Sequence, residues 1–207
     1  MSSFNVFTQK SRKGGGSIPV WLGTVSPVPV GGTLASAFCK EGVLIPAGSP
    51  VNLTGGVLTP VVVYKVVAST AESMTLVPEG VDMAPTTNDK IMVPSADGTG
   101  TAAAITGVSV GESGYVVATT LNAGVGKYVV FANGTGANKA MAVKPTGYLY
   151  NDIAVESAKP GESFDYIGAT GAVVVFHGEG ILINRTPAAG IADLMKVAVP
   201  NVIQVEY

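Results

Sequence analysis

Charged side chains are scarce in this sequence of 207 residues: Asp, Glu, Lys and Arg make up only 13% of it, against about 25% in typical soluble domains. The net charge is −2, so no strong basic field draws the chain toward nucleic acid. A surface with so little charge is a solubility hazard for an isolated chain. We therefore expect copies of the chain or a partner to cover part of it. The alternative is a compact monomer with neutral Thr, Ser and Asn on its surface.

Cysteine and histidine occur once each, as Cys39 and His177. A single cysteine allows no disulfide within the chain, which suits assembly in a reducing cytoplasm. A histidine-based metal site needs further ligands at set spacing, and none accompanies His177. We expect His177 to end a strand, Cys39 to be a small buried residue, and the chain to hold no metal and no cofactor.

Long hydrophobic runs are also missing. No stretch approaches the roughly 18–20 apolar residues that span a bilayer, so we expect no membrane partner. The N-terminus lacks a basic region followed by an apolar one, so it does not indicate a secretory signal. The glycosylation sequons at Asn52, Asn133 and Asn184 are therefore interpreted as chance.

Glycine (27) and proline (13) are abundant and separate short runs rich in Val, Ile, Thr and Tyr. This pattern predicts a mainly β protein with many short strands joined by turns. Gly55-Gly56 predicts a hairpin turn, and Pro46 with Gly48 predicts a tight corner between two short strands. A loop is expected between residues 158 and 171. Strands are expected at residues 61–67, 73–77, 90–93, 101–110, 115–121, 127–131, 140–143, 148–150, 172–176 and 180–183.

One short helix is expected near the C-terminus. Thr186 is a suitable N-cap and Pro187 a suitable first helical residue, while Pro200 ends the helix. Between them, apolar side chains recur at three- and four-residue spacing, which predicts one buried face. These apolar residues are Ile191, Leu194, Met195 and Ala198.

Two patterns suggest catalysis, and neither has the context that catalysis needs. Residues 107–111 match G-x-S-x-G, but a nucleophile elbow requires a helix after the serine, and residues 112–117 indicate a turn into another strand. Paired carboxylates cleave glycosides, but the acidic residues near the C-terminal third alternate with Gly and Pro, which indicates a solvated loop. These residues are Asp152, Glu156, Glu162 and Asp165. We expect the chain not to be an enzyme.

Residues 1–16 have the composition of a terminal arm. Apolar residues come first, basic residues follow, and Gly14-Gly15-Gly16 forms a hinge, since three glycines carry a high ordering cost. A frayed terminus is the alternative. The candidate partner-binding residues are Phe4, Val6, Phe7, Lys10, Arg12 and Lys13.

Two parts of the sequence resemble lambda-type phage head-decoration proteins. Residues 45–51 (Ile-Pro-Ala-Gly-Ser-Pro-Val) with 56–60 (Gly-Val-Leu-Thr-Pro) are similar to one segment of that family, and residues 145–153 with 171–180 are similar to its later half. The tail, residues 188–207, is similar to the end of phage head fibre (auxiliary capsid) proteins. The resemblance implies a β-tulip-like domain, often a homotrimer, that binds the major capsid protein on the outer surface of the virion. Such a protein is made in the cytoplasm of the host bacterium.

The resemblance also implies a division of the chain, because about 80 residues separate its two matching halves. We expect an N-terminal capsid-binding arm (1–16), a discontinuous decoration domain (17–60 plus 140–207) and an inserted small β-barrel or sandwich domain (61–139). An insertion is best tolerated at an exposed turn.

The function expected from these observations is that of a virion structural protein that stabilises or decorates the capsid. The alternative is a carbohydrate-binding or adhesion module of a phage fibre, for which a glycan is the ligand. That alternative predicts exposed aromatic residues beside Asp or Asn, and Tyr148, Tyr150 and Asn151 are its candidates.

Overall fold

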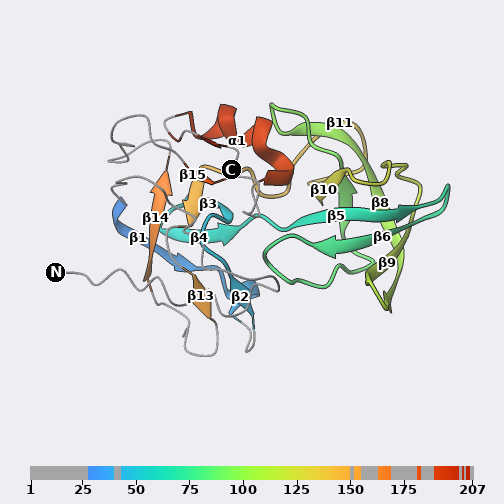
Figure 1. Cartoon of the computed structure of the whole chain (residues 1–207), viewed down its shortest axis with the longest axis horizontal. Helices are drawn as coiled ribbons and strands as arrows, with labels where there is room; N and C mark the ends of the chain where they lie inside the picture. Colours follow the sequence, from blue (N-terminus) through green and yellow to red (C-terminus); the bar gives the residue numbers. More distant parts are fainter. Residues whose placement is uncertain are drawn as a thin grey trace.

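The computed structural model describes residues 28–39, 43–149, 152–154, 163–168, 181–182, 189–200, 202 and 204–205. The protein is mainly β with one short helix, which confirms the predicted fold class. The tulip-like shape stays a prediction. Figure 1 shows the strands gathered into two groups that lie along the long axis of the molecule. Each group closes into a barrel.

The first barrel has five strands. Strands β1 and β4 pair in parallel and close it, with Thr33 opposite Val57. All its other pairs are antiparallel. In order around the barrel the strands are β1 (Val28–Leu34), β14 (Ser163–Gly168), β12 (Gly147–Leu149), β3 (Pro50–Thr54) and β4 (Val57–Pro60).

Two predicted turns of this barrel are confirmed. Gly55 and Gly56 join β3 to β4 with φ angles of 58° and 77°, and a tight hairpin turn with two positive φ angles strongly favours glycine. At the corner after β2 (Leu44–Ile45), the backbone N–H of Ser49 donates to the Pro46 carbonyl at 3.1 Å, and Gly48 has a φ of 76°. The chain therefore reverses here through local geometry.

Strand β14 corrects the predicted loop between residues 158 and 171. Residues 163–168 pair with β1 on one side and β12 on the other. The sequence Ser-Phe-Asp-Tyr-Ile-Gly alternates polar and apolar residues over its first four positions, a weak strand signal beside Gly and Pro. Pairing on both edges outweighs the nearby turn residues.

The second barrel has six strands and is closed by pairing of its first and last strands, β8 and β9. A further strand, β11 (Gly136–Ala140), pairs with the first part of β8. In order around the barrel the strands are β8 (Thr99–Gly111), β7 (Lys90–Met92), β10 (Tyr128–Phe131), β5 (Val63–Ser69), β6 (Ser73–Pro78) and β9 (Gly114–Thr119).

The strand expected at residues 140–143 is wrong. Pairing with β8 begins earlier, at Gly136, and ends at Ala140. Beyond it, Met141 makes only an isolated bridge to Ala132. Strand β11 is exposed at every position except the half-buried Lys139 because it lies outside the closed barrel, so the sequence offers no apolar alternation there.

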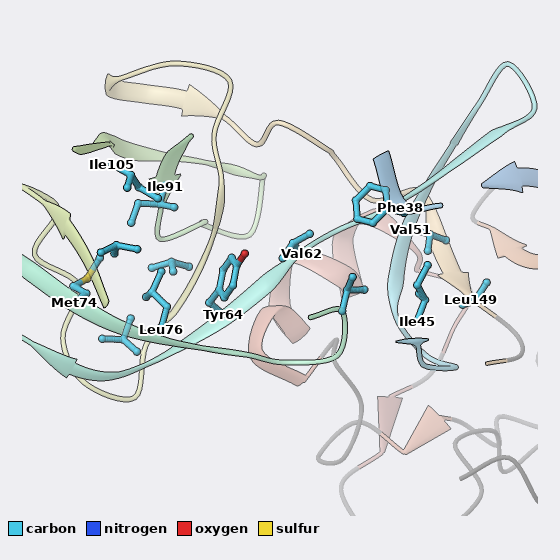
Figure 2. Packing of buried hydrophobic residues seen from close by; sticks show 14 of the residues in the cluster. Phe38, Ile45, Val51, Val62, Tyr64, Met74, Leu76, Ile91, Ile105 and Leu149 are labelled. Atoms are coloured by element: carbon cyan, nitrogen blue, oxygen red, sulfur yellow. The ribbon is translucent and has the colours of Figure 1, made fainter. Parts of the chain in front are cut away.

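The interiors of the two barrels belong to one hydrophobic cluster. Tyr64 and Leu76, both 0% exposed, belong to the six-stranded barrel, and Val51 and Leu149, also 0% exposed, belong to the five-stranded barrel. Val62 lies between these two groups (Figure 2). The packing is therefore continuous along the molecule.

A second cluster covers the outside of the six-stranded barrel. Four side chains face one another across β8, β7, β10 and β5 through direct register pairs, so all four lie on the outer face. Each is at most 4% exposed because the C-terminal helical segment packs against them. The four residues are Ala102, Met92, Val130 and Val63.

The segment that covers this row is η4 (Ala189–Ile191) followed by α1 (Ala192–Ala198). The predicted short helix and its buried face are confirmed at Ile191, Leu194 and Met195, while Ala198 is half-buried. The α-helix begins at Ala192, and the expected cap residues Thr186 and Pro187 lie outside the described residues. Two further short strands, β15 (Ile181–Leu182) and β16 (Gln204–Val205), pair in parallel, and β13 (Ile153–Ala154) pairs with β2.

Strand pairing changes from one barrel to the other between residues 60 and 63 and between 140 and 147. The helix, which comes from the C-terminal part of the chain, nevertheless packs on the six-stranded barrel. The division into a decoration domain (17–60 plus 140–207) and an inserted domain (61–139) therefore stays a prediction.

Gly190 sets how closely the helical segment approaches the barrel. A Cβ at this position would lie 2.1 Å from Cδ1 of Tyr128, much closer than any real contact. We expect Gly190→Ala to lower the free energy of unfolding by about 1–3 kcal/mol, because overpacking displaces the segment or the ring. Denaturant unfolding measures the change.

The matched control is Gly124→Ala, since nothing lies within 4 Å of a Cβ there. It should leave stability unchanged or raise it slightly. Adding Tyr128→Ala should restore part of the loss in the Gly190→Ala variant. Equal stability of the two single glycine variants would contradict the close approach.

Candidate functional site

The residues predicted from sequence to bind a partner lie outside the described residues, and so does His177. They are Phe4, Val6, Phe7, Lys10, Arg12 and Lys13. Their role as a capsid-binding arm stays a prediction.

The G-x-S-x-G match lies in β8, and the chain continues through a turn at Glu112 and Ser113 directly into β9. The interpretation as a strand-to-strand turn is confirmed. Ser109 is exposed on the strand and pairs with Val116 of β9. The backbone here is that of a hairpin, which does not form the strained turn that exposes a nucleophile.

The acidic residues between 152 and 165 were predicted to lie in a solvated loop, and this is wrong for Asp152 and Asp165. The half-buried Asp152 accepts a hydrogen bond of 2.6 Å from the backbone N–H of Ala47, which ties the second resembling segment to the corner of the first. Asp165 lies in strand β14, while Glu156 and Glu162 lie outside the described residues. Across the described ranges, no group of three His, Cys, Asp or Glu side chains is placed to hold a metal ion.

Two other expectations are corrected by burial. Cys39 is half-buried instead of buried, and its Sγ lies 3.7 Å from the carbonyl oxygens of Leu34 and Ala35. Tyr148, a candidate for stacking on a sugar, is 1% exposed and belongs to the cluster under the helix. The other glycan candidates, Tyr150 and Asn151, lie outside the described residues.

An exposed apolar surface occurs where the β8–β9 hairpin extends beyond β7. Val108 is opposite Val117 and Val110 is opposite Tyr115, so these four side chains lie on one face of the hairpin. Val117 is 0% exposed, Val108 is 36% exposed and Val110 is 82% exposed. We call this set of four residues the hairpin shelf.

The shelf continues the inner face of the barrel. Tyr115 and Val117 are opposite Leu76 and Met74 of β6, which are buried inside the barrel. On the other side, β7 pairs only with residues 102–104 of β8. The end of β8 therefore lacks that neighbour, and its inward-facing valines meet solvent.

Tyr115 of the shelf begins a row of three aromatic rings, in the order Tyr115, Tyr64, Phe131. The ring of Tyr64 makes edge contacts with both others, at centroid distances of 5.6 Å to Phe131 and 6.5 Å to Tyr115. The Tyr64 hydroxyl donates to the Met83 carbonyl, and the Tyr115 hydroxyl donates to Asp82 Oδ1 at 2.8 Å. Both bonds tie the connection between β6 and β7 to this end of the barrel.

Burial raises the pKa of both hydroxyls. Burial raises the pKa of Tyr64 well above its ordinary value, with the charges of Tyr115, Asp89 and Asp82 adding to the effect. Burial also raises the pKa of Tyr115 to about 12, and its hydrogen bond to Asp82 contributes. The Tyr115 hydroxyl therefore stays protonated at pH values where an ordinary tyrosine ionises, and the site combines an apolar shelf with a tyrosine–carboxylate pair.

Such a surface suits the binding of an apolar partner surface with a polar rim, because apolar contact supplies most of the affinity and polar groups set the orientation. This surface was not predicted from the sequence, although Val108 and Val110 lie within the G-x-S-x-G match. The alternation of Val108 and Val110 before a glycine-containing turn indicates a strand with one apolar face. It does not indicate that β7 pairs with only residues 102–104 of β8 and leaves that face uncovered. Within the described residues, no helix is long and apolar enough to cross a membrane.

Comparisons of the chain with protein families, with curated proteins and with solved structures found no match.

The raised pKa of Tyr115 predicts a pH dependence of stability. The folded chain holds this proton more tightly than the unfolded chain, whose tyrosine has the ordinary pKa of 10.0. The free energy of unfolding should therefore be fully maintained below pH 10 and fall as the pH rises through about 12. Denaturant unfolding across this range measures the fall.

Tyr115→Phe removes the titrating group, so its stability should fall less steeply over the same pH range. At neutral pH the variant should lose about 1 kcal/mol with its hydrogen bond to Asp82. Curves for the variant and the wild type that run parallel from pH 10 to 12 would contradict the assigned environment of Tyr115.

Proposed function

We propose that this chain is a virion structural protein that binds the outside of a phage capsid through the major capsid protein. The observation that carries the proposal is how its two resembling segments pair. Residues 45–51 and 145–153 are about 90 residues apart in sequence, yet Pro50 is opposite Tyr148 and Ile45 is opposite Ile153. The described residues of the two segments thus pair with each other twice, once within the five-stranded barrel and once in the separate two-stranded sheet of β2 and β13.

The physical character of the molecule supports the same role. Two closed barrels with continuous packing form a stiff body, and stiffness limits the conformational entropy lost on docking. The low charge reduces the cost of desolvating a large contact surface. Many identical copies on a shell turn modest single contacts into lasting attachment, and a trimer would add to this effect.

The arm at residues 1–16 is proposed as one contact with the shell. Deletion of these residues should weaken attachment on the order of a hundredfold, because it removes one of two linked contacts. Occupancy is measured on purified, undecorated heads of the phage that encodes the chain. The unfolding transition of the truncated chain serves as the control for folding, and full occupancy by the truncated chain would rule out the arm as a tether.

The hairpin shelf is proposed as the second contact. Val110→Asp should weaken attachment about tenfold, because it replaces about 1.5 kcal/mol of apolar burial with a charge. The matched control is Val125→Asp. Val125 is 65% exposed and lies beyond the opposite end of β9 from the hairpin turn, so its change should leave attachment intact. Equal loss in both variants would argue against a specific role for the shelf.

A carbohydrate-binding role is the second candidate, and one observation favours it. Tyr115, which is half-buried, lies beside Asp82 at the end of a barrel, the aromatic–carboxylate pairing that sugar recognition uses. The same purified chain tested on a glycan panel separates the two roles. Binding to a glycan that Tyr115→Ala abolishes, with no attachment to heads, would replace the capsid proposal.

A further inference from the structure

The connection between β10 and β11 contains Asn133-Gly134, the only Asn-Gly pair in the sequence. The backbone N–H of Asn133 is held by the Ala140 carbonyl at 3.0 Å, and the preceding residue, Ala132, makes a bridge to Met141. Asn133 itself is exposed. Within the described residues, its side-chain amide makes no hydrogen bond. The backbone of Asn133 is thus held by a hydrogen bond on its N-terminal side, while its side chain is exposed to solvent.

Gly134 leaves room for a reaction with this side chain. The nearest atoms to the position of a Cβ on Gly134 are Cδ and Cε of Lys139, at 3.5 and 3.8 Å, and both belong to a flexible stem. Glycine also permits backbone conformations that other residues rarely adopt. Among the hydrogen bonds of the described residues, none uses the N–H of Gly134. That nitrogen is therefore available as a nucleophile.

We propose that Asn133 is a site of spontaneous deamidation. The Gly134 amide nitrogen gives up its proton to a base and attacks Cγ of Asn133. The bond from Cγ to the side-chain nitrogen breaks, and ammonia leaves with a proton from solvent. Water then opens the resulting five-membered imide at either carbonyl and gives aspartate or isoaspartate. One water enters and one ammonia leaves, so no other reactant is needed.

The chain contains its own comparison at Asp97-Gly98, its only Asp-Gly pair. There the glycine nitrogen donates to the Ser95 carbonyl at 3.0 Å. The Asp97 Oδ1 accepts from the Ser95 hydroxyl at 2.6 Å and from the N–H and hydroxyl of Thr99 at 2.9 and 2.8 Å. Because both the nucleophile and the carboxylate are held in hydrogen bonds, this pair is protected from forming an imide in the folded chain.

Deamidation changes the surface beside β11. Each conversion adds one negative charge next to the Lys139 side chain, on a chain whose net charge is only −2. The isoaspartate product also lengthens the main chain just before β11, whose pairing with β8 begins at Gly136 opposite Ala102. A protein that persists in an assembled particle would accumulate both products with age.

The test incubates the folded, full-length chain in mildly alkaline buffer and follows the peptides by mass spectrometry, with detection of isoaspartate. Conversion at Asn133 should exceed conversion at the exposed residues Asn88 and Asn122 by at least about tenfold, a difference of about 1.4 kcal/mol in barrier. Isoaspartate should be absent at Asp97 in the folded chain and should appear there in denaturant.

Gly134→Ala is the matched variant. A Cβ at this position meets only the Lys139 stem at an ordinary contact distance, so the variant should unfold at the same denaturant concentration as the wild type. Its conversion at Asn133 should be slower by about tenfold or more. The proposal is overturned if Asn133 converts no faster than Asn122, or if Gly134→Ala leaves the rate unchanged.

Discussion

Much of this structure depends on the contact between the C-terminal helical segment and the outer face of the six-stranded barrel. Four strands each place one side chain in a row across that face, and Ile191, Leu194 and Met195 cover the row. Each such apolar side chain contributes about 1.5–3 kcal/mol when it is fully buried. Without the helix, an apolar stripe would face solvent. Because the helix follows the last strands of the five-stranded barrel in sequence, this contact also fastens the two barrels to each other.

The candidate site arises from unequal strand lengths. β8 has 13 residues and β7 has 3, so β8 beyond Ala104 pairs with β9 alone. Beyond that point the inward face of the hairpin loses its covering, and Val108 and Val110 are exposed while Val117 stays buried. The tyrosine hydroxyls hold the connection between β6 and β7 over the interior nearby. A barrel that closed fully would bury these valines and leave no shelf.

Two turns of the six-stranded barrel, at Asp97-Gly98 and at Asn133-Gly134, differ in how their side chains and glycine nitrogens are hydrogen-bonded. The turn at Asp97 satisfies its carboxylate and its glycine nitrogen with local hydrogen bonds, which makes it both a good turn and an inert one. The connection at Asn133 is held only through its backbone and leaves its amide in solvent. Strand β11, which follows it, lies outside the closed barrel and is mostly exposed. Deamidation at Asn133 would therefore occur beside a strand that takes no part in closing the barrel.

The sequence by itself determined the features that depend on near neighbours. Alternation and turn residues predicted the mainly β class, the Gly55-Gly56 hairpin, the turn at residues 111–114 and the buried face of the helix. Each depends on a local pattern, because a turn needs particular φ angles and a helix repeats every few residues. Such patterns are visible without knowledge of the fold.

Only the tertiary structure decided which strands pair and which faces are covered. Val63 and Tyr64 are both apolar and both buried, yet one lies under the helix and the other inside the barrel, so no alternation marks their faces. Strand β14 exists because two distant strands pair with it, and Gly190 matters because Tyr128 lies against it. These outcomes depend on contacts between residues far apart in sequence, and a local pattern carries no information about where the chain will return.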